Sequence, residues 1–391
     1  MDNLYNIEKA KKCQNDLDLR VYTSNLLGQN SELVLHGGGN TSVKTVVDGE
    51  EILLVKGSGW DLVSIKAEGF APVKLKPLLE MAKLPDLNDV EMVHQQKMAM
   101  TDKEAPTPSV EAILHALIPY KFVDHTHADA IVTISNSETG IENIAKLFPT
   151  FLIIEYVMPG FLLAHEIYKR TKDLDWSLID GIILHNHGVF TFDDDAKNSY
   201  EKMINAVTLA ERFLDENAVI KIEHKYLHSE CNIAKIIKVI SEAKGYDVSI
   251  NINQTPLAAF YASQENLKAF ASRGVLTPEH IIRTKRVPLI MEDTNLEDAL
   301  ADYMKAYRKY FEEFAVNKVA LNATPNYMII KNLAVISFGK TREEAAIVND
   351  IVQHTMLAVL RADKLGGYKS ISLKESFDME YWELEQAKLK K

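Results

Sequence analysis

The sequence predicts an α/β protein of two domains. Two early segments, ELVLHGGGNTSVKTVV and EEILLVKGSGWDL, alternate short apolar runs with glycine turns, a pattern typical of strands joined by tight turns. Residues 194–216 carry apolar side chains at helical spacing and predict a long amphipathic helix. The chain has 391 residues, more than one hydrophobic core usually supports. Gly245 and the polar stretch NINQTP mark the boundary, so we expect domains at 1–250 and 251–391.

The other elements follow from local patterns taken in order. FVDHTHADAIVTI predicts a strand that crosses a bend, and GIILHNHGVFTF predicts a pair of strands. Ser109 follows two prolines and has the side chain of a helix cap before VEAILHALI. Helices are predicted at residues 4–28, 87–101, 142–147, 161–172, 194–216 and 220–244.

The second domain contains a candidate internal repeat. NYMIIKNLAVISF resembles GIILHNHGVFTF, and an amphipathic helix follows each segment. Aligned without gaps, Asn186 meets Asn332, His187 meets Leu333 and Phe192 meets Phe338. Two interpretations stay open at this point. The second domain is a degenerate copy without the histidines, or the likeness is the one that any two strand–turn–helix units share.

Composition excludes several classes of function. The net charge of −11 argues against a nucleic-acid partner, because phosphate backbones are bound by basic surfaces. No apolar run reaches the roughly 18 residues of a membrane-spanning helix. The polar N-terminus lacks the apolar core of a secretory signal, so we expect a cytoplasmic protein. Cys13 and Cys231 are the only cysteines, so a metal site would be held mainly by histidine and carboxylate.

Two closely spaced histidine pairs are the strongest chemical signal in the chain. His125 and His127 form one pair, and His185 and His187 form the other. In a strand, residues i and i+2 share a face, so either pair could bind one metal ion. Catalytic sites usually have three protein ligands and an open position. The residues alone therefore indicate a metal site without deciding which three of the four rings form it.

Glu111 and two glycine turns complete the set of candidates. Glu111 is a metal ligand, a general base, or an ordinary first-turn glutamate that stabilises the helix dipole. The turns HGGGNTS (36–42) and KGSG (56–59) are either anion cradles of backbone N–H groups or simple tight turns. His115 lies one helical turn after Glu111, and we expect it to pack in the core or an interface, with support of the site from behind Glu111 as the alternative.

Together these segments resemble the class II aldolase/adducin family of zinc-dependent sugar-phosphate aldolases, over about residues 20–220. The resemblance rests on five motifs in order: Gly39-Asn40 with Ser42, Ser58-Gly59, Ser109 with Glu111, His125-x-His127, and Asn186-His187-Gly188. SRGVLTPEHIIRTK and FDMEYWELEQAKL also resemble parts of longer proteins that fuse such an aldolase to a short-chain dehydrogenase. We therefore expect this chain to be a free-standing version of the aldolase part.

The resemblance implies a layered fold with a largely antiparallel central sheet flanked by helices. It implies that Zn²⁺, or Co²⁺ or Mn²⁺ in its place, is bound by His125, His127 and His187, and that His185 is not a ligand. Glu111 would be the catalytic acid/base and could also occupy the metal without substrate. The substrate phosphate would be bound by Gly39, Asn40, Ser58, Gly59 and Ser109. The second turn departs from the family's threonine-rich pattern, which puts the phosphate specificity in doubt.

The implied activity is an aldolase that cleaves a ketose 1-phosphate to dihydroxyacetone phosphate and an aldehyde through a zinc-stabilised enediolate. A pentulose-phosphate 4-epimerase is an alternative, although its members carry Asp at the position of Glu111. A sugar-phosphate dehydratase would share Glu111, and an adducin-like binding protein would need no metal. The expected partner is a small sugar phosphate, and relatives suggest a homo-oligomer, either a dimer or a tetramer.

Overall fold

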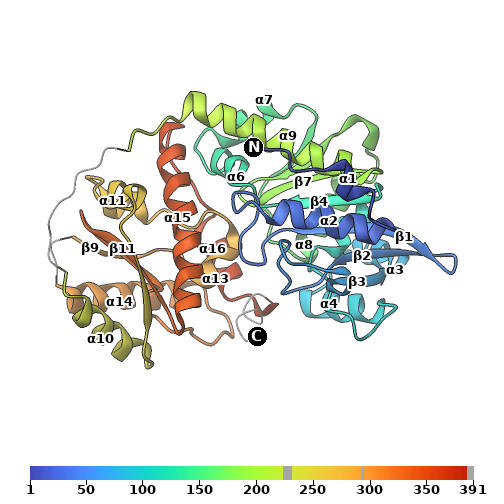
Figure 1. Ribbon diagram of the computed structural model, residues 1–391. Helices are drawn as coiled ribbons and strands as arrows, with labels where there is room; N and C mark the ends of the chain where they lie inside the picture. The colour runs from blue at the N-terminus through green and yellow to red at the C-terminus, as the bar shows by residue number, and fades with distance from the viewer. Residues whose placement is uncertain (223–230, 293–294, 385–391) are drawn as a thin grey trace. The chain divides into compact units, whose positions relative to one another are not determined.

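A computed structural model describes residues 1–222, 231–292 and 295–384, and contacts within it divide the chain into two compact units. The first unit comprises Met1–Ser135 and Gly140–Phe213. The second comprises Asn136–Thr139 and the chain from Leu214 onward, so the predicted boundary at residue 250 falls inside it. Both units combine a sheet with helices, which confirms the predicted α/β class (Figure 1). None of the helices in the described ranges is long and apolar enough to span a membrane.

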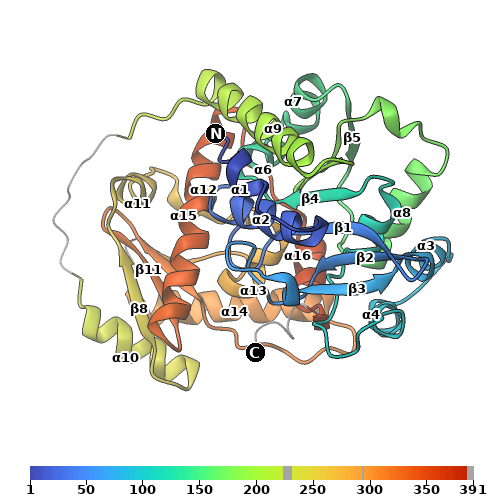
Figure 2. The ribbon, with the colours of Figure 1, turned by 45° about the vertical axis from the view of Figure 1, so that its right-hand side comes forward.

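The first unit is built on a seven-stranded sheet of order β3-β2-β1-β4-β7-β6-β5. Every neighbouring pair is antiparallel except β5 and β6, as the predicted antiparallel sheet requires. Figure 2 shows the blue strands β1, β2 and β3 running alongside one another. The strands are β1 (Asn40–Val47), β2 (Glu50–Lys56), β3 (Phe70–Lys74), β4 (Phe122–Thr126), β5 (Phe151–Ile154), β6 (Gly181–Leu184) and β7 (Gly188–Asp193).

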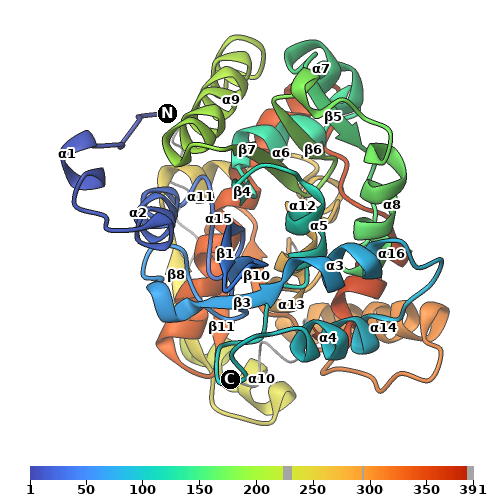
Figure 3. The same cartoon turned by 90° about the vertical axis from the view of Figure 1, so that its right-hand side faces the viewer.

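Helices cover both faces of this sheet. Leu78, Ile113 and Phe161 of α3, α5 and α8 pack against Leu53 and Val73 on one face. On the other face α2 lies against β1 and β4 (Figure 3). The helices are α1 (Ile7–Ala10), α2 (Asp16–Gly28), α3 (Leu75–Ala82), α4 (Asp89–Met98), α5 (Ala112–Leu117), α6 (Asp129–Ser135), α7 (Gly140–Leu147), α8 (Phe161–Thr171) and α9 (Ala196–Asn217).

Three predicted elements differ from the structure. The helix expected at residues 4–28 is broken in two, because Asn15 caps a new helix by accepting from Asp18 N. The segment ADAIVTI was expected to be strand, but it forms α6, since short apolar runs do not distinguish strand from buried helix. The helix expected at 220–244 is seen as α10 from Ile233, and residues 223–230 lie outside the described ranges.

The second unit contains a four-stranded sheet of order β8-β11-β10-β9, in which only β9 and β10 are parallel. Its strands are β8 (Ser249–Asn253), β9 (Leu289–Met291), β10 (Tyr327–Ile330) and β11 (Ala334–Gly339). Its helices are α10 (Ile233–Lys244), α11 (Pro256–Ala262), α12 (Leu267–Ala271), α13 (Ile281–Thr284), α14 (Leu296–Phe314), α15 (Arg342–Lys364) and α16 (Leu373–Glu380).

The second unit repeats the topology of part of the first. The order β4-α6-α7-β5-α8-β6-β7-α9 corresponds to β8-α11-α12-β9-α14-β10-β11-α15, apart from the short helix α13 that the second unit adds before β9. The strand order and directions agree. The register agrees as well, because Phe192 pairs with Val123 in the first unit and Phe338 pairs with Ile250 in the second. The likeness between the two sequence segments is therefore part of a larger likeness in topology, which is what the repeat interpretation predicts.

The two hairpin turns of the repeat have the same geometry. Asn186 and Asn332 both adopt left-handed backbone conformations, with φ of 59° and 62°. The His187 amide donates to Leu184 O at 3.1 Å, and the Leu333 amide donates to Ile330 O at 3.0 Å. With strand register as the guide, the three predicted zinc ligands correspond to Ile252, Gln254 and Leu333. The copy therefore retains the backbone of the histidine site without its rings.

Candidate metal and active site

Three histidines from two segments converge at one end of the first unit's sheet. His125 lies near the end of β4, His127 follows that strand, and His187 is the last residue of the β6–β7 turn. One nitrogen from each ring lies within 4.8 Å of the others, and His125 Nε2 is 3.1 Å from His127 Nε2. Tetrahedral zinc with bonds of about 2.0–2.1 Å needs nitrogens about 3.3–3.4 Å apart. The donor set and its spacing therefore fit a single divalent metal ion.

The surroundings of His125 fix which nitrogen faces the other rings. His125 Nδ1 lies 3.1 Å from the carbonyl oxygen of Val189 and must donate to it, because a carbonyl only accepts. The proton therefore sits on Nδ1, and Nε2 presents a lone pair, as metal-ligating histidines usually do. The Phe190 ring stacks on His125 with centroids 4.0 Å apart, which holds the imidazole plane.

Glycine is required where the turn of His187 meets β4. A Cβ built on Gly188 would lie 2.4 Å from Thr126 O and 2.9 Å from His125 Cε1. A side chain at this position would displace either the strand or the ring. Gly188 thus allows the β6–β7 turn to approach close enough for His187 to meet the other two histidines.

His185 is outside the group that the three rings form. The left-handed Asn186 separates it from His187, so the segment is a tight turn rather than a strand with i and i+2 on one face. His185 Nδ1 instead contacts Asn186 Oδ1 at 2.5 Å. The geometry therefore distinguishes between two histidines that the residue pattern alone left equivalent.

Glu111 lies directly beside the three rings. It is the residue before α5 and is only 6% exposed. Its Oε2 is 3.5 Å from His125 Nε2, and its Oε1 is 3.8 Å from His187 Nε2. At these distances the carboxylate could bind a metal ion held by the rings, or take a proton from a molecule bound there.

The first glycine turn packs against the end of β4 that carries His125. A Cβ on Gly39, whose φ is +63°, would lie 2.7 Å from His125 O. A Cβ on Gly38 would lie 3.3 Å from His127 Nδ1. Asn40 opens β1 and pairs across the sheet with His125. This turn is therefore placed by the same strand that carries the first ligand.

The second glycine turn lies next to Ser109. Ser58 N donates to Thr107 O at 2.8 Å, and Ser109 N donates to Lys56 O at 3.1 Å. Ser109 Oγ accepts from Glu111 N at 3.2 Å and from Asn40 Nδ2 at the same distance. Ser109 thus joins the two turns to Glu111. Ser109 is not the cap of α5, because the cap is Glu111 and the helix starts two residues later than predicted.

Four polar residues near the site were not assigned from the sequence. The buried Lys56 ammonium donates to Gly37 O at 3.2 Å. Lys56 belongs to the second glycine turn and Gly37 to the first, so this hydrogen bond connects the two turns. On the opposite face of β4, the Asp124 carboxylate accepts from Arg20 and Ser199, and all three side chains are fully buried. Burial lowers the pKa of Arg20, and Asp124 opposes that shift. The sequence signal that could have indicated this group is Asp124, a charged residue inside the buried strand β4.

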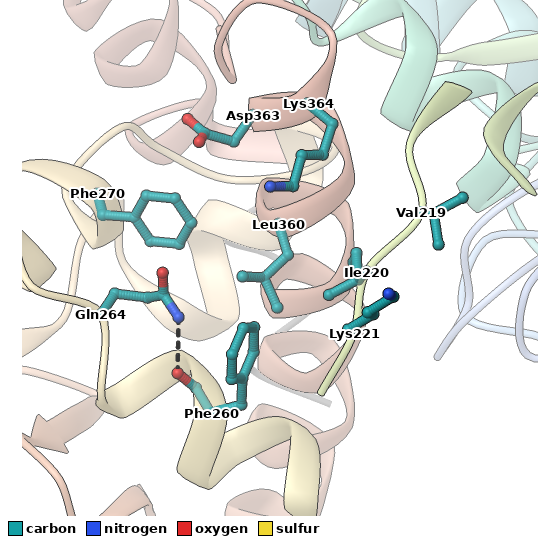
Figure 4. A pocket seen from close by; sticks show the side chains of 9 residues that line it. All are labelled: Val219, Ile220, Lys221, Phe260, Gln264, Phe270, Leu360, Asp363 and Lys364. Carbon is teal, nitrogen blue, oxygen red and sulfur yellow. Dashed lines mark hydrogen bonds between the residues drawn. The ribbon is translucent and has the colours of Figure 1, made fainter. Parts of the chain in front are cut away.

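A separate pocket in the second unit has a different character (Figure 4). Phe260, Phe270 and Leu360 give it an apolar floor, and Asp363 and Lys364 lie at its edge. The Gln264 amide within it donates to Phe260 O at 2.9 Å. None of its lining residues belongs to the motifs singled out in the sequence.

Comparison with known proteins places the chain in a family. Residues 19–214 match the Class II Aldolase and Adducin N-terminal domain, and residues 228–389 match the second domain of class II aldolases. The "Uncharacterized oxidoreductase YuxG" of Bacillus subtilis is 28% identical over 417 residues, which cover 99% of this chain and 60% of that protein. The N-terminal class II aldolase domain of a conserved Thermoplasma acidophilum protein is 41% identical, with a TM-score of 0.50, and covers 55% of this chain and 99% of its own. This chain belongs to the class II aldolase and adducin family.

Proposed function

We propose that this protein is a metal-dependent aldolase that cleaves a ketose 1-phosphate to dihydroxyacetone phosphate and an aldehyde. One observation carries the proposal: a buried carboxylate, Glu111, lies 3.5 Å and 3.8 Å from nitrogens of two rings in a three-histidine cluster. Aldol cleavage needs an electrophile on a carbonyl and a group that moves a proton beside it, and this arrangement offers both.

His125, His127 and His187 would hold the metal, and Zn²⁺ fits three imidazole donors best, with Co²⁺ or Mn²⁺ as substitutes. A divalent ion there would act as a Lewis acid toward the substrate carbonyl. Glu111 would move the proton at the carbon next to that carbonyl, acting as base in one direction and as acid in the other. Its burial excludes bulk water from that proton.

The substrate phosphate would lie against the two glycine turns. Gly39, Asn40, Ser58, Gly59 and Ser109 are the residues proposed to bind it. The close approach of the turns supports this assignment, since Ser109 bonds to both. The Lys56 ammonium adds a buried positive charge at the same place, which favours an anion. We also propose that the protein is cytoplasmic and that it forms a homo-oligomer.

Two other enzymes on this site are alternatives. A pentulose-phosphate 4-epimerase would break a similar bond, and a sugar-phosphate dehydratase would use the same glutamate. A metal-free adducin-like role is disfavoured by four buried or half-buried polar groups arranged around one point. The description oxidoreductase belongs to a relative of which this chain spans 60%, and we do not extend it to this chain.

The first test measures metal in protein purified without added metal or chelator. One divalent ion per chain is expected. Dihydroxyacetone phosphate is then incubated with the enzyme in D₂O, because proton transfer at the carbon beside the carbonyl exchanges hydrogen for deuterium without any aldehyde. Proton NMR should show exchange by wild type, and product assays with a panel of ketose 1-phosphates would identify the aldehyde.

Glu111→Gln should abolish the exchange and keep the metal, and the exposed Glu104→Gln is the matched control. Protein that binds no metal even after zinc addition would rule out the aldolase. Metal-loaded protein that exchanges no hydrogen on dihydroxyacetone phosphate would contradict the aldolase proposal and favour the epimerase or the dehydratase.

A further inference from the structure

A line of buried hydrogen bonds runs from Glu111 to His115 through the strand β1. Asn40 Nδ2 lies 2.6 Å from Glu111 Oε2, and Asn40 Oδ1 contacts His115 Nε2. On its other side, His115 Nδ1 lies 2.8 Å from Ser42 Oγ. His115 and Ser42 are fully buried, and Asn40 is 6% exposed. From its place in the sequence His115 is expected mainly to pack, yet both of its nitrogens have polar partners.

The chemistry of these groups permits one arrangement when Glu111 is ionised. A carboxylate only accepts, so Asn40 must turn its NH₂ group toward Glu111. The Asn40 oxygen then faces His115, whose Nε2 must carry the proton and donate it. His115 Nδ1 is left as an acceptor, and the Ser42 hydroxyl donates to it. Burial lowers the pKa of His115 well below its usual range, consistent with a neutral ring.

Secondary structure holds this line rigid at both ends. Asn40 and Ser42 lie on one side of β1 at i and i+2, and Asn40 pairs across the sheet with His125. Glu111 and His115 lie one turn apart, since His115 N donates to Glu111 O at 3.1 Å. The edge of the His115 ring meets Phe190 with centroids 5.4 Å apart, and Phe190 also stacks on His125. The line therefore shares its supports with a proposed metal ligand.

We propose that His115 is a positioning residue that holds Asn40, and through it the Glu111 carboxylate, in the orientation needed for proton transfer. The proposal rests on the function proposed above and adds a residue to its machinery. Ser42 selects the tautomer of His115, and His115 selects the rotamer of Asn40. If His115 only packed, an apolar side chain of similar size in its place would leave the Glu111 carboxylate in its present orientation.

His115→Leu and His115→Gln separate the two roles. Leucine fills space without donating, whereas the glutamine amide can still donate to Asn40 Oδ1. In the exchange assay with dihydroxyacetone phosphate, His115→Leu should lower kcat about 10- to 100-fold, the scale of a misplaced catalytic group, with KM and metal content unchanged. His115→Gln should recover most of that loss, and Ser42→Ala should give a smaller one.

His165→Leu is the matched control, since this half-buried histidine of α8 hydrogen-bonds a backbone carbonyl, Ala82 O, at 3.0 Å. A His115→Leu enzyme with wild-type kcat would overturn the proposal, as would equal losses in the leucine and glutamine variants.

Crystal structures of wild type and both variants keep the proposal testable whatever the reaction is. Glu111 should leave Asn40 in His115→Leu and keep this bond in His115→Gln. A Glu111 carboxylate that stays on Asn40 in the leucine variant would refute the positioning role even if no substrate is turned over. Failure of the wild type to bind metal or exchange hydrogen would instead refute the proposed function, so the two failures are distinguishable.

Discussion

At the scale of single residues, Asn186 decides which histidine of its segment meets the other two. Its left-handed conformation places His187 at the end of the turn beside β4, whereas His185 turns to the Asn186 side chain. Asparagine tolerates this conformation better than most residues, so one position can both form the turn and orient its neighbours. Which histidine joins the cluster thus depends on a backbone angle of the residue between the two.

We expect His187→Ala and His185→Ala to differ sharply in metal binding. Loss of His187 removes one of three donors, so zinc affinity should fall by about 100-fold or more. This loss exceeds the usual effect of mutating a residue that only orients a ligand. Loss of His185 should change affinity by less than about tenfold. Competition titration with a zinc chelator measures both. Equal losses would mean that the turn can rearrange to offer either ring.

At the scale of elements, the short helix α5 carries Glu111 at its start and is anchored at its end by Lys44 of β1. The Lys44 ammonium donates to three carbonyl oxygens, of His115 at 3.0 Å, Ile118 at 2.5 Å and Tyr120 at 2.8 Å. A positive charge at a helix C-terminus also interacts favourably with the helix dipole. One side chain therefore fixes the end of the helix that supports the proposed acid/base.

Replacing Lys44 with Met should lower the free energy of unfolding by about 2–4 kcal/mol, because three carbonyl groups lose a charged donor. Lys74→Met, which breaks a largely exposed pair with Glu50, should cost about 0–1 kcal/mol. Urea denaturation measures both. A Lys44 variant as stable as the Lys74 variant would show that water replaces the ammonium at no cost.

At the scale of the whole molecule, the second unit has a polar cluster of its own that ties distant parts of the chain together. Lys285 Nζ lies 3.1 Å from Glu380 Oε1 and 3.9 Å from the centre of the Tyr307 ring. Tyr307 also donates to Glu380 at 2.7 Å and contacts the Tyr381 hydroxyl at 2.8 Å. Lys285 and Glu380 are almost fully buried, so each charged form is stabilised by the other.

Lys285→Met should therefore destabilise the second unit by about 3–5 kcal/mol, since it removes the ammonium that lies 3.1 Å from the buried Glu380 carboxylate. Adding Glu380→Leu should restore part of that loss, because both charges are then gone. Lys374→Met, on the same helix as Glu380, breaks an exposed pair with Asp378 and should cost under about 1 kcal/mol. Thermal unfolding of the full chain is the measurement. A double variant less stable than Lys285→Met would contradict the argument.

Local patterns predicted the parts of the fold that depend on near neighbours. The hairpin of His187 and the helix after it follow from periodicity, and His125 and His127 are two residues apart. The β-branched run in ADAIVTI suits a strand, but packing makes the segment part of the helix α6. The hydrogen-bond partners of His115 could not be predicted, because Asn40 and Ser42 lie more than 70 residues away in the sequence.

The shared register of the two hairpins also bears on ancestry. β4–β7 and β8–β11 agree in order, direction and pairing, as duplication of one half-domain would produce, while Ile252, Gln254 and Leu333 stand where rings stand in the first unit. Asn332 has its left-handed turn conformation although Leu333 follows it. One backbone therefore carries two different sets of side chains, and the turn forms without the histidines that accompany it in the first unit.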